Sequence, residues 1–174
     1  PYMHVPMIPT FIKPASDIPY GRDVMVMAVG HRSIEIHLIC FQENGSVIVK
    51  DKHEVPMPGA EREVSKLEFY SQMAQALLPY LDRTQTVGIS FAFEREILPN
   101  LDGRIVNLSK EIRAPEVIGT RIVENLEAAL RDRGITEETH MVVLNNTVAS
   151  LLAGFAHSYE HHYSSYASFI LDSG

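Results

Sequence analysis

The stretch from Val142 to Ser150 reads VVLNNTVAS and combines three local signals within a few residues. Its apolar start is typical of a buried strand, and the small and apolar residues at its end favour a helix. Two short polar side chains, Asn145 and Asn146, stand between them, where asparagine favours a turn or a helix N-terminus. Because ligand sites of α/β folds commonly lie at the carboxyl ends of strands, this junction predicts a site at the two asparagines.

The rest of the chain predicts how the fold is organised around that junction. Apolar runs and apolar–polar alternation predict strands over residues 24–29, 33–41, 46–55, 86–93, 104–108, 141–144 and 168–171. Helical spacing of apolar residues predicts helices over residues 61–81, 115–133 and 147–158. Asn44 and Gly45 indicate a two-residue hairpin turn, and Gly134 indicates a helix C-terminal cap. This order predicts a mixed α/β sheet that opens with three antiparallel strands.

Composition and charge narrow the possible classes of function. The chain has 174 residues, 45% of them hydrophobic and 21% charged, so it can bury a sizeable core. A formal net charge of −7 argues against nucleic acid as the main partner, because phosphate contacts need clustered Lys and Arg. No apolar run reaches the length of a membrane span, no signal peptide is visible, and the single cysteine, Cys40, fits a reducing compartment. We therefore expect a cytoplasmic protein with no nucleic-acid or membrane partner.

Four patches, in the same order along the chain, resemble the hexokinase family. Two of them read MIPTFI from Met7 and GISFAF from Gly88, where the family has LPTFV and GFTFSF. The next reads VNLSKEI from Val106, where the family has LNWTKGF, and the last reads NNTVA from Asn145, where the family has NDTVA. The resemblance implies a ribonuclease H-like fold, shared by actin-like ATPases and sugar kinases. It also implies the family's activity, the phosphorylation of a hexose by ATP with Mg²⁺.

The same resemblance implies which residues hold a glucose-like hexose. It places Ser109, Lys110 and Asn145 at sugar-binding positions, and Ala92 stands where the family has a serine, so that one sugar contact is lost. From the residues alone, other interpretations stay open. Lys110 can be an ordinary solvated lysine, Ser109 a strand-end hydroxyl, and Asn145 simply the N-cap of the following helix.

The most consequential departure from the family is Asn146, which stands at the position of the catalytic aspartate. Phosphoryl transfer needs a group that orients the attacking hydroxyl and accepts its proton, and an amide cannot take that proton. Loss of a positioned general base typically lowers a rate by a factor of about 10²–10⁴. Glu94 or Glu96, just after the strand predicted over residues 86–93, is the carboxylate that would replace it in a variant enzyme.

The nucleotide-binding positions depart from the family as well. The resemblance places the contacts of the two phosphate loops at Gly30, Arg32, Ser33, Ser173 and Gly174. Around the first loop, Ala28 replaces an aspartate, His31 replaces a glycine, and Glu35 replaces an arginine. A carboxylate at Glu35 repels phosphate unless a cation intervenes. Arg32 can bind phosphate by itself or be an ordinary turn arginine.

The expected organisation is an N-terminal arm over residues 1–22 and a hexokinase-like small lobe, with the start of the large lobe, over residues 23–174. We expect this chain to be a fragment of a longer two-lobe protein, with the missing large lobe as its partner. No metal site is predicted, because a solvated helix end explains His157, His161 and His162 better than a zinc site does. Three functions remain: a variant hexokinase, a catalytically inactive sugar-binding sensor or regulator, and an interaction scaffold. The inactive sugar binder is favoured.

Overall fold

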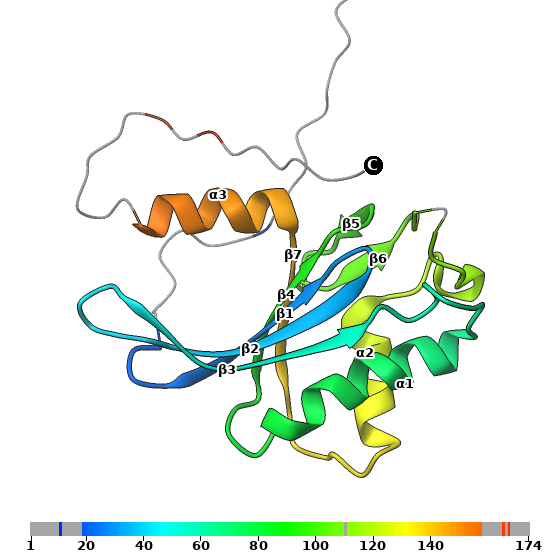
Figure 1. The fold of residues 1–174 in the computed structure, drawn as a ribbon, viewed down its shortest axis with the longest axis horizontal. Coiled ribbons are helices and arrows are strands. Elements are labelled where there is room, and N and C mark those ends of the chain that lie inside the picture. The colour runs from blue at the N-terminus through cyan, green and yellow to red at the C-terminus, as the bar shows by residue number, and fades with distance from the viewer. Residues whose placement is uncertain (1–10, 12–18, 110, 158–164, 166, 168–174) are drawn as a thin grey trace, which may run out of the picture.

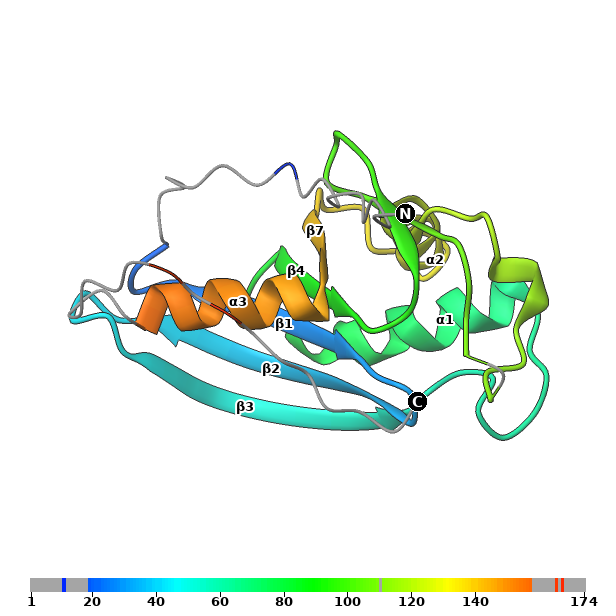
Figure 2. The same ribbon diagram turned by 90° about the horizontal axis from the view of Figure 1, so that it is seen from above.

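The computed structural model describes residues 11, 19–109, 111–157, 165 and 167, and this part of the chain is built around one five-stranded sheet (Figure 1). Helices α1 (Lys66–Leu77) and α2 (Ile122–Arg131) lie on one side of the sheet, and α3 (Asn146–His157) lies on the other (Figures 1 and 2). This is the layering of an α/β domain.

The strands of the main sheet are β1 (Asp23–Val29), β2 (Ser33–Phe41), β3 (Val47–Pro56), β4 (Thr86–Phe91) and β7 (His140–Asn145). Their spatial order is β3-β2-β1-β4-β7. Strand β2 pairs antiparallel with both β1 and β3, whereas β4 pairs parallel with both β1 and β7. The predicted mixed sheet with three antiparallel strands at its start is confirmed, and so is the ribonuclease H-like arrangement.

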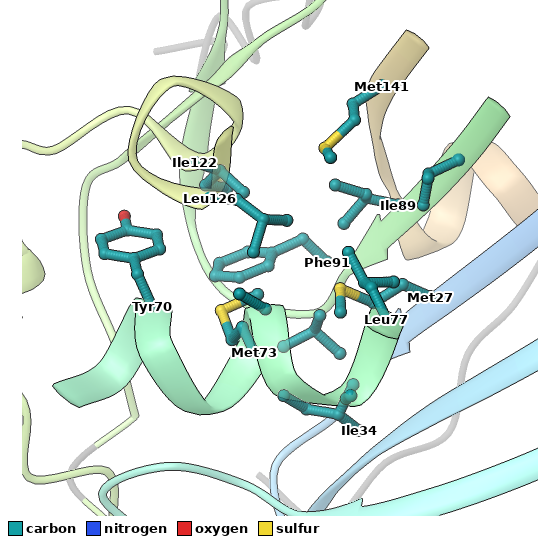
Figure 3. Packing of buried hydrophobic residues seen from close by; sticks show 14 of the residues in the cluster. Met27, Ile34, Tyr70, Met73, Leu77, Ile89, Phe91, Ile122, Leu126 and Met141 are labelled. Atoms are coloured by element: carbon teal, nitrogen blue, oxygen red, sulfur yellow. The ribbon is translucent and has the colours of Figure 1, made fainter. Parts of the chain in front are cut away.

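Alternation along the strands decides which face of the sheet is buried. On β2, Ile34, Ile36 and Leu38 are fully buried, and the residues between them are half-buried. Figure 3 shows Phe91 of β4 packed with Met73 of α1 in the same apolar cluster. Because the apolar side chains of strands and helices meet here, the core lies between the sheet and the α1–α2 layer.

Helix α1 begins later than the helix predicted over residues 61–81. Ser65 caps it, since its hydroxyl accepts a hydrogen bond from the amide of Glu68 at 3.2 Å. The amide of Val64 instead donates to the carbonyl of Arg113 at 2.9 Å, which draws the preceding segment away from the helix. A 3₁₀ turn, η1 (Leu78–Tyr80), follows α1. The prediction was wrong at its start because it passed over the local cap at Ser65, and because a contact far along the chain holds the preceding segment.

The single helix predicted over residues 115–133 is two elements. A 3₁₀ turn, η2 (Pro115–Val117), comes first, and the chain then turns at Gly119, whose φ of +80° suits glycine. The buried carboxylate of Asp102 accepts the amide of Val123 at 2.7 Å and so caps the N-terminus of α2. Gly119 was the local sign of this boundary, but the capping group itself lies about 20 residues upstream and could not be predicted.

A second, two-stranded sheet joins β5 (Arg95–Ile97) to β6 (Gly103–Ile105). Strand β5 falls in a segment with no predicted element, and β6 is shorter than the strand predicted over residues 104–108. Strand β4 also ends at Phe91, two residues earlier than predicted.

The hairpin between β2 and β3 turns at Asn44 and Gly45, as predicted, but residues 42–46 separate the two strands, so its loop is longer than two residues. The amide of Gln42 donates to the carbonyl of Ser46 at 2.9 Å, which closes the ladder around residues 43–45. The strand predicted over residues 168–171 lies outside the described residues.

Candidate functional site

The three parallel strands of the sheet end side by side. Val29 of β1 pairs in register with Phe91 of β4, which pairs with Asn145 of β7. The residues that follow these strand ends therefore emerge at one edge of the sheet, among them Gly30, Ala92 and Asn146. We call this edge the carboxyl edge. Its position agrees with the rule that ligand sites of open α/β sheets lie at the carboxyl ends of parallel strands.

At the junction between β7 and α3, the two asparagine side chains bind the helix N-terminus. The amide of Thr147 donates to Oδ1 of Asn145 at 2.8 Å and to Oδ1 of Asn146 at 2.9 Å, and the Thr147 hydroxyl also donates to Asn145. The capping interpretation of Asn145 therefore holds for its oxygen. Its amide nitrogen, Nδ2, has no partner among the described residues, so a cap and a ligand contact are compatible in one side chain.

Asn146 is half-buried at the first position of α3. Its side chain can donate or accept a hydrogen bond, but it cannot take a proton at physiological pH. Of the alternative bases, both Glu94 and Glu96 are exposed, and Glu96 forms an ion pair with Arg104 at 3.4 Å. Neither glutamate side chain bonds to the helix N-terminus at the carboxyl edge, whereas both asparagine side chains do.

The loop after β6 returns to the end of β4. The carbonyl of Glu94 accepts the amides of Val106 at 2.9 Å and Asn107 at 3.2 Å. Two residues further on, the hydroxyl of Ser109 is buried and has no hydrogen-bond partner among the described residues. A buried hydroxyl without a partner costs about 1–3 kcal/mol, so Ser109 is suited to a polar ligand. Lys110 lies outside the described residues.

The turn between β1 and β2 holds the positions of the first phosphate loop. The amide of Gly30 donates to the carbonyl of Ser33 at 3.0 Å, and a Cβ on Gly30 would lie 3.2 Å from that oxygen, so the turn is tight enough to favour glycine. The Arg32 side chain is exposed. The ring of His31 instead packs edge-on against Phe93, with 4.9 Å between ring centroids. Contacts with other residues of the chain hold this turn in place, and His31 stands where the family has a glycine.

The carboxylate of Glu35, beside this turn, is paired with cationic and polar neighbours. Glu35 pairs across the strands with Ala28, and its carboxylate lies 2.9 Å from Nζ of Lys52 and 3.1 Å from Nε2 of His37. Lys52 first, then His37, hold the pKa of Glu35 below its usual range, so the carboxylate is ionised at neutral pH. Lys52 offsets the negative charge of Glu35, so the departure that remains is Ala28. Without a carboxylate at position 28, these residues do not fit a magnesium–ATP complex.

The other residues considered for nucleotide or metal contacts give no further evidence about the site. Ser173 and Gly174 lie outside the described residues, as do His161 and His162. Among the side chains that the structure describes, which do not include that of His157, no group of three or more His, Cys, Asp and Glu is placed to hold a metal ion. In the same part of the chain, no helix is both long and apolar enough to cross a bilayer.

Comparison with known proteins establishes the family of the chain. The model of the hexokinase family matches residues 2–156, most of the chain. The chain belongs to the hexokinase family. It is 20% identical over 159 residues to hexokinase-2 of Rattus norvegicus and 21% identical over 153 residues to hexokinase-3 of Mus musculus. These alignments cover 87% and 84% of this chain but only 17% and 16% of the two relatives, so it spans about a sixth of their length.

Solved structures of the hexokinase family and of related kinases share the fold. A hexokinase from Schistosoma mansoni in complex with glucose superposes with a TM-score of 0.70 at 17% identity, over 86% of this chain and 35% of that one. A polyphosphate/ATP-glucomannokinase from Arthrobacter gives a TM-score of 0.51 at 15% identity, over 79% of this chain and 48% of that one. At these identities the likeness establishes the fold and leaves the chemistry to the residues themselves.

Two buried charged residues of this hexokinase-family chain escaped the sequence analysis. Asp102, for which no role was predicted, accepts the amides of Gly103 at 2.6 Å and of Val123, and so ties β6 to α2. Arg95, in a segment interpreted as irregular, is only 9% exposed. The apolar residues on either side of Arg95, Phe93 and Ile97, form a two-residue alternation that could have indicated β5.

Proposed function

We propose that this hexokinase-family chain binds a hexose at the carboxyl edge and does not transfer phosphate to it. The observation that carries the proposal is the pair of asparagines at the junction between β7 and α3. Asn145 keeps the amide that a sugar needs, whereas Asn146 puts an amide where the family has its proton-accepting carboxylate. The protein would then act in the cytoplasm as a sugar sensor or regulator and not as a glycolytic enzyme.

The sugar-binding half of the proposal is supported by unsatisfied polar groups. Ser109 Oγ is buried without a partner among the described residues, and Asn145 Nδ2 is likewise unpaired there. A hexose hydroxyl can accept from one group and donate to the other, which would relieve both. By resemblance to the family, Lys110, next to Ser109, is the third residue that would contact the sugar. Ala92 offers no hydroxyl, so we expect weaker selection among hexoses than in the family.

Two departures from the family pattern support the proposed absence of phosphoryl transfer. Asn146 cannot accept the proton of the attacking hydroxyl. Ala28 offers no carboxylate for the metal ion that accompanies ATP. We therefore derive no ATP- or magnesium-dependent step for this chain. Its relatives extend well beyond it, so catalysis by the whole protein stays a matter for direct assay.

A thermal-shift titration with glucose, mannose and fructose, paired with a coupled phosphorylation assay, tests the proposal. We expect at least one hexose to raise the melting temperature, Mg-ATP to leave it unchanged, and no sugar phosphate to form. Ser109→Ala should weaken the sugar-dependent shift, and Ser46→Ala, at the exposed hairpin far from the edge, is the matched control. Turnover by the wild-type chain would contradict the inactive half, and the absence of any sugar-dependent shift would contradict the binding half.

A further inference from the structure

Two side-chain atoms of the described residues are buried without a hydrogen-bond partner: Ser109 Oγ and Arg95 Nε. The hydroxyl belongs to the proposed sugar site, but the arginine has no role in it so far. Arg95 is 9% exposed, and among the described residues its side chain makes one hydrogen bond, from Nη1 to the carbonyl oxygen of Phe93. In the described part of the chain no carboxylate lies within ion-pair distance of its guanidinium. Within the described residues it is therefore a buried cation without an anion.

Loss of a proton does not remove the buried charge of Arg95 at neutral pH. Burial lowers its pKa to about 10, which still leaves the guanidinium charged at neutral pH. An uncompensated buried charge is strongly unfavourable, whereas a carboxylate or phosphate matches the planar fork of a guanidinium with two parallel hydrogen bonds. A neutral hexose offers hydroxyls only, so it would leave the charge of Arg95 uncompensated.

The position of Arg95 connects it to the sugar site. It pairs across the small sheet with Ile105, and the residue before it, Glu94, accepts the amides of Val106 and Asn107. The strand that carries Arg95 and the loop that leads to Ser109 are therefore one hydrogen-bonded unit beside the end of β4. Both unpartnered atoms belong to this unit, which suggests that one ligand satisfies both.

We propose that the physiological ligand is an anionic sugar, a hexose bearing a carboxylate or a phosphate group that pairs with Arg95. The inference rests on the proposed sugar-binding function and names its substrate class. Ser109 and Asn145 contact the hydroxyls, and Arg95 selects the charged group. Because a bidentate ion pair in a buried setting is stronger than a hydrogen bond to a neutral hydroxyl, the charged sugar binds more tightly.

Calorimetric titration of the full 174-residue chain tests this selection. The probes are glucose, glucuronate, glucose 1-phosphate and inorganic phosphate, at one fixed ionic strength. Glucuronate or glucose 1-phosphate should bind at least about ten-fold more tightly than glucose. Arg95→Met should abolish that preference and leave glucose binding in place, and Arg95→Lys should retain part of it. Arg104→Gln removes an exposed arginine of the neighbouring strand and should leave the preference unchanged.

The outcomes separate this inference from the function on which it rests. Glucose binding as tight as that of both anionic sugars overturns the inference and leaves the proposed function standing. Binding of no sugar at all overturns the proposed function. A preference that survives in Arg95→Met, or inorganic phosphate binding as tightly as glucose 1-phosphate, also overturns the inference. Thermal unfolding shows whether the Arg95→Met variant is folded. It should melt at or above the wild-type temperature, because the unpaired charge is gone.

Discussion

The helix-covered face of the sheet and the carboxyl edge of the same strands are built on different principles. On the covered face, side chains such as Phe91 and Met73 are fully buried and apolar. Near the edge, two polar atoms, Ser109 Oγ and Arg95 Nε, are buried without a hydrogen-bond partner among the described residues. The comparison teaches that the stability of this domain comes from the covered face, whereas the edge retains unsatisfied polar groups that a ligand can satisfy.

The largest effect that sharpens this comparison is expected from Phe91→Ala. Phe91 is fully buried between the sheet and the helices, so its truncation should lower the free energy of unfolding by about 3–5 kcal/mol in urea denaturation. Leu67→Ala is the control, because Leu67 on α1 is 69% exposed and its loss should change the same quantity by less than about 0.5 kcal/mol. Similar effects for the two variants would contradict the assignment of the core.

A smaller loss is expected from Asp102→Ala, at the boundary between the two regions. The substitution removes the cap of α2 and leaves buried amides without an acceptor, so the free energy of unfolding should fall by about 2–3 kcal/mol. Asp102→Asn keeps one acceptor oxygen and should lose less. If both variants unfold at the same urea concentration as the wild type, the link between β6 and α2 does not stabilise the fold.

The smallest effect is a pH dependence at Glu35. Because its pKa is lowered in the folded state, mainly by Lys52, its contribution is present above the unfolded pKa of about 4.3 and is lost as the pH falls through the lower folded value. Below about pH 4, Glu35→Gln should therefore lose less stability than the wild type. The side chain is 37% exposed, so solvent screening keeps the difference below about 1 kcal/mol. A difference that persists in 1 M salt would contradict an exposed ion pair.

Much of the fold was predictable because its signals are local. The alternation over residues 33–41 predicted β2 with the bounds it has, and the apolar run that ends at Asn145 predicted β7 and the start of α3. The errors occurred where a distant residue decides. The carbonyl of Arg113 helps set the start of α1, and Asp102 sets the start of α2. A short strand such as β5 gives too few residues for a reliable period.

The candidate site was predictable only as far as it follows strand ends and the family pattern. Asn145, Asn146 and Ala92 do emerge at one edge, and Ser109 lies on a loop tied to the end of β4. Their functional roles stay predictions. Burial of the Arg95 charge could not be predicted, because the sequence shows an arginine among acidic and apolar neighbours, and only tertiary packing removes it from water.

The most direct test of the central claim is calorimetric titration of the chain with hexose, in the absence and presence of Mg-ATP. We expect a saturable binding heat that Mg-ATP does not change and that Ser109→Ala reduces. No binding heat with any neutral or anionic hexose, or a continuing heat of turnover once Mg-ATP is added, would contradict the claim that this domain holds a sugar without phosphorylating it.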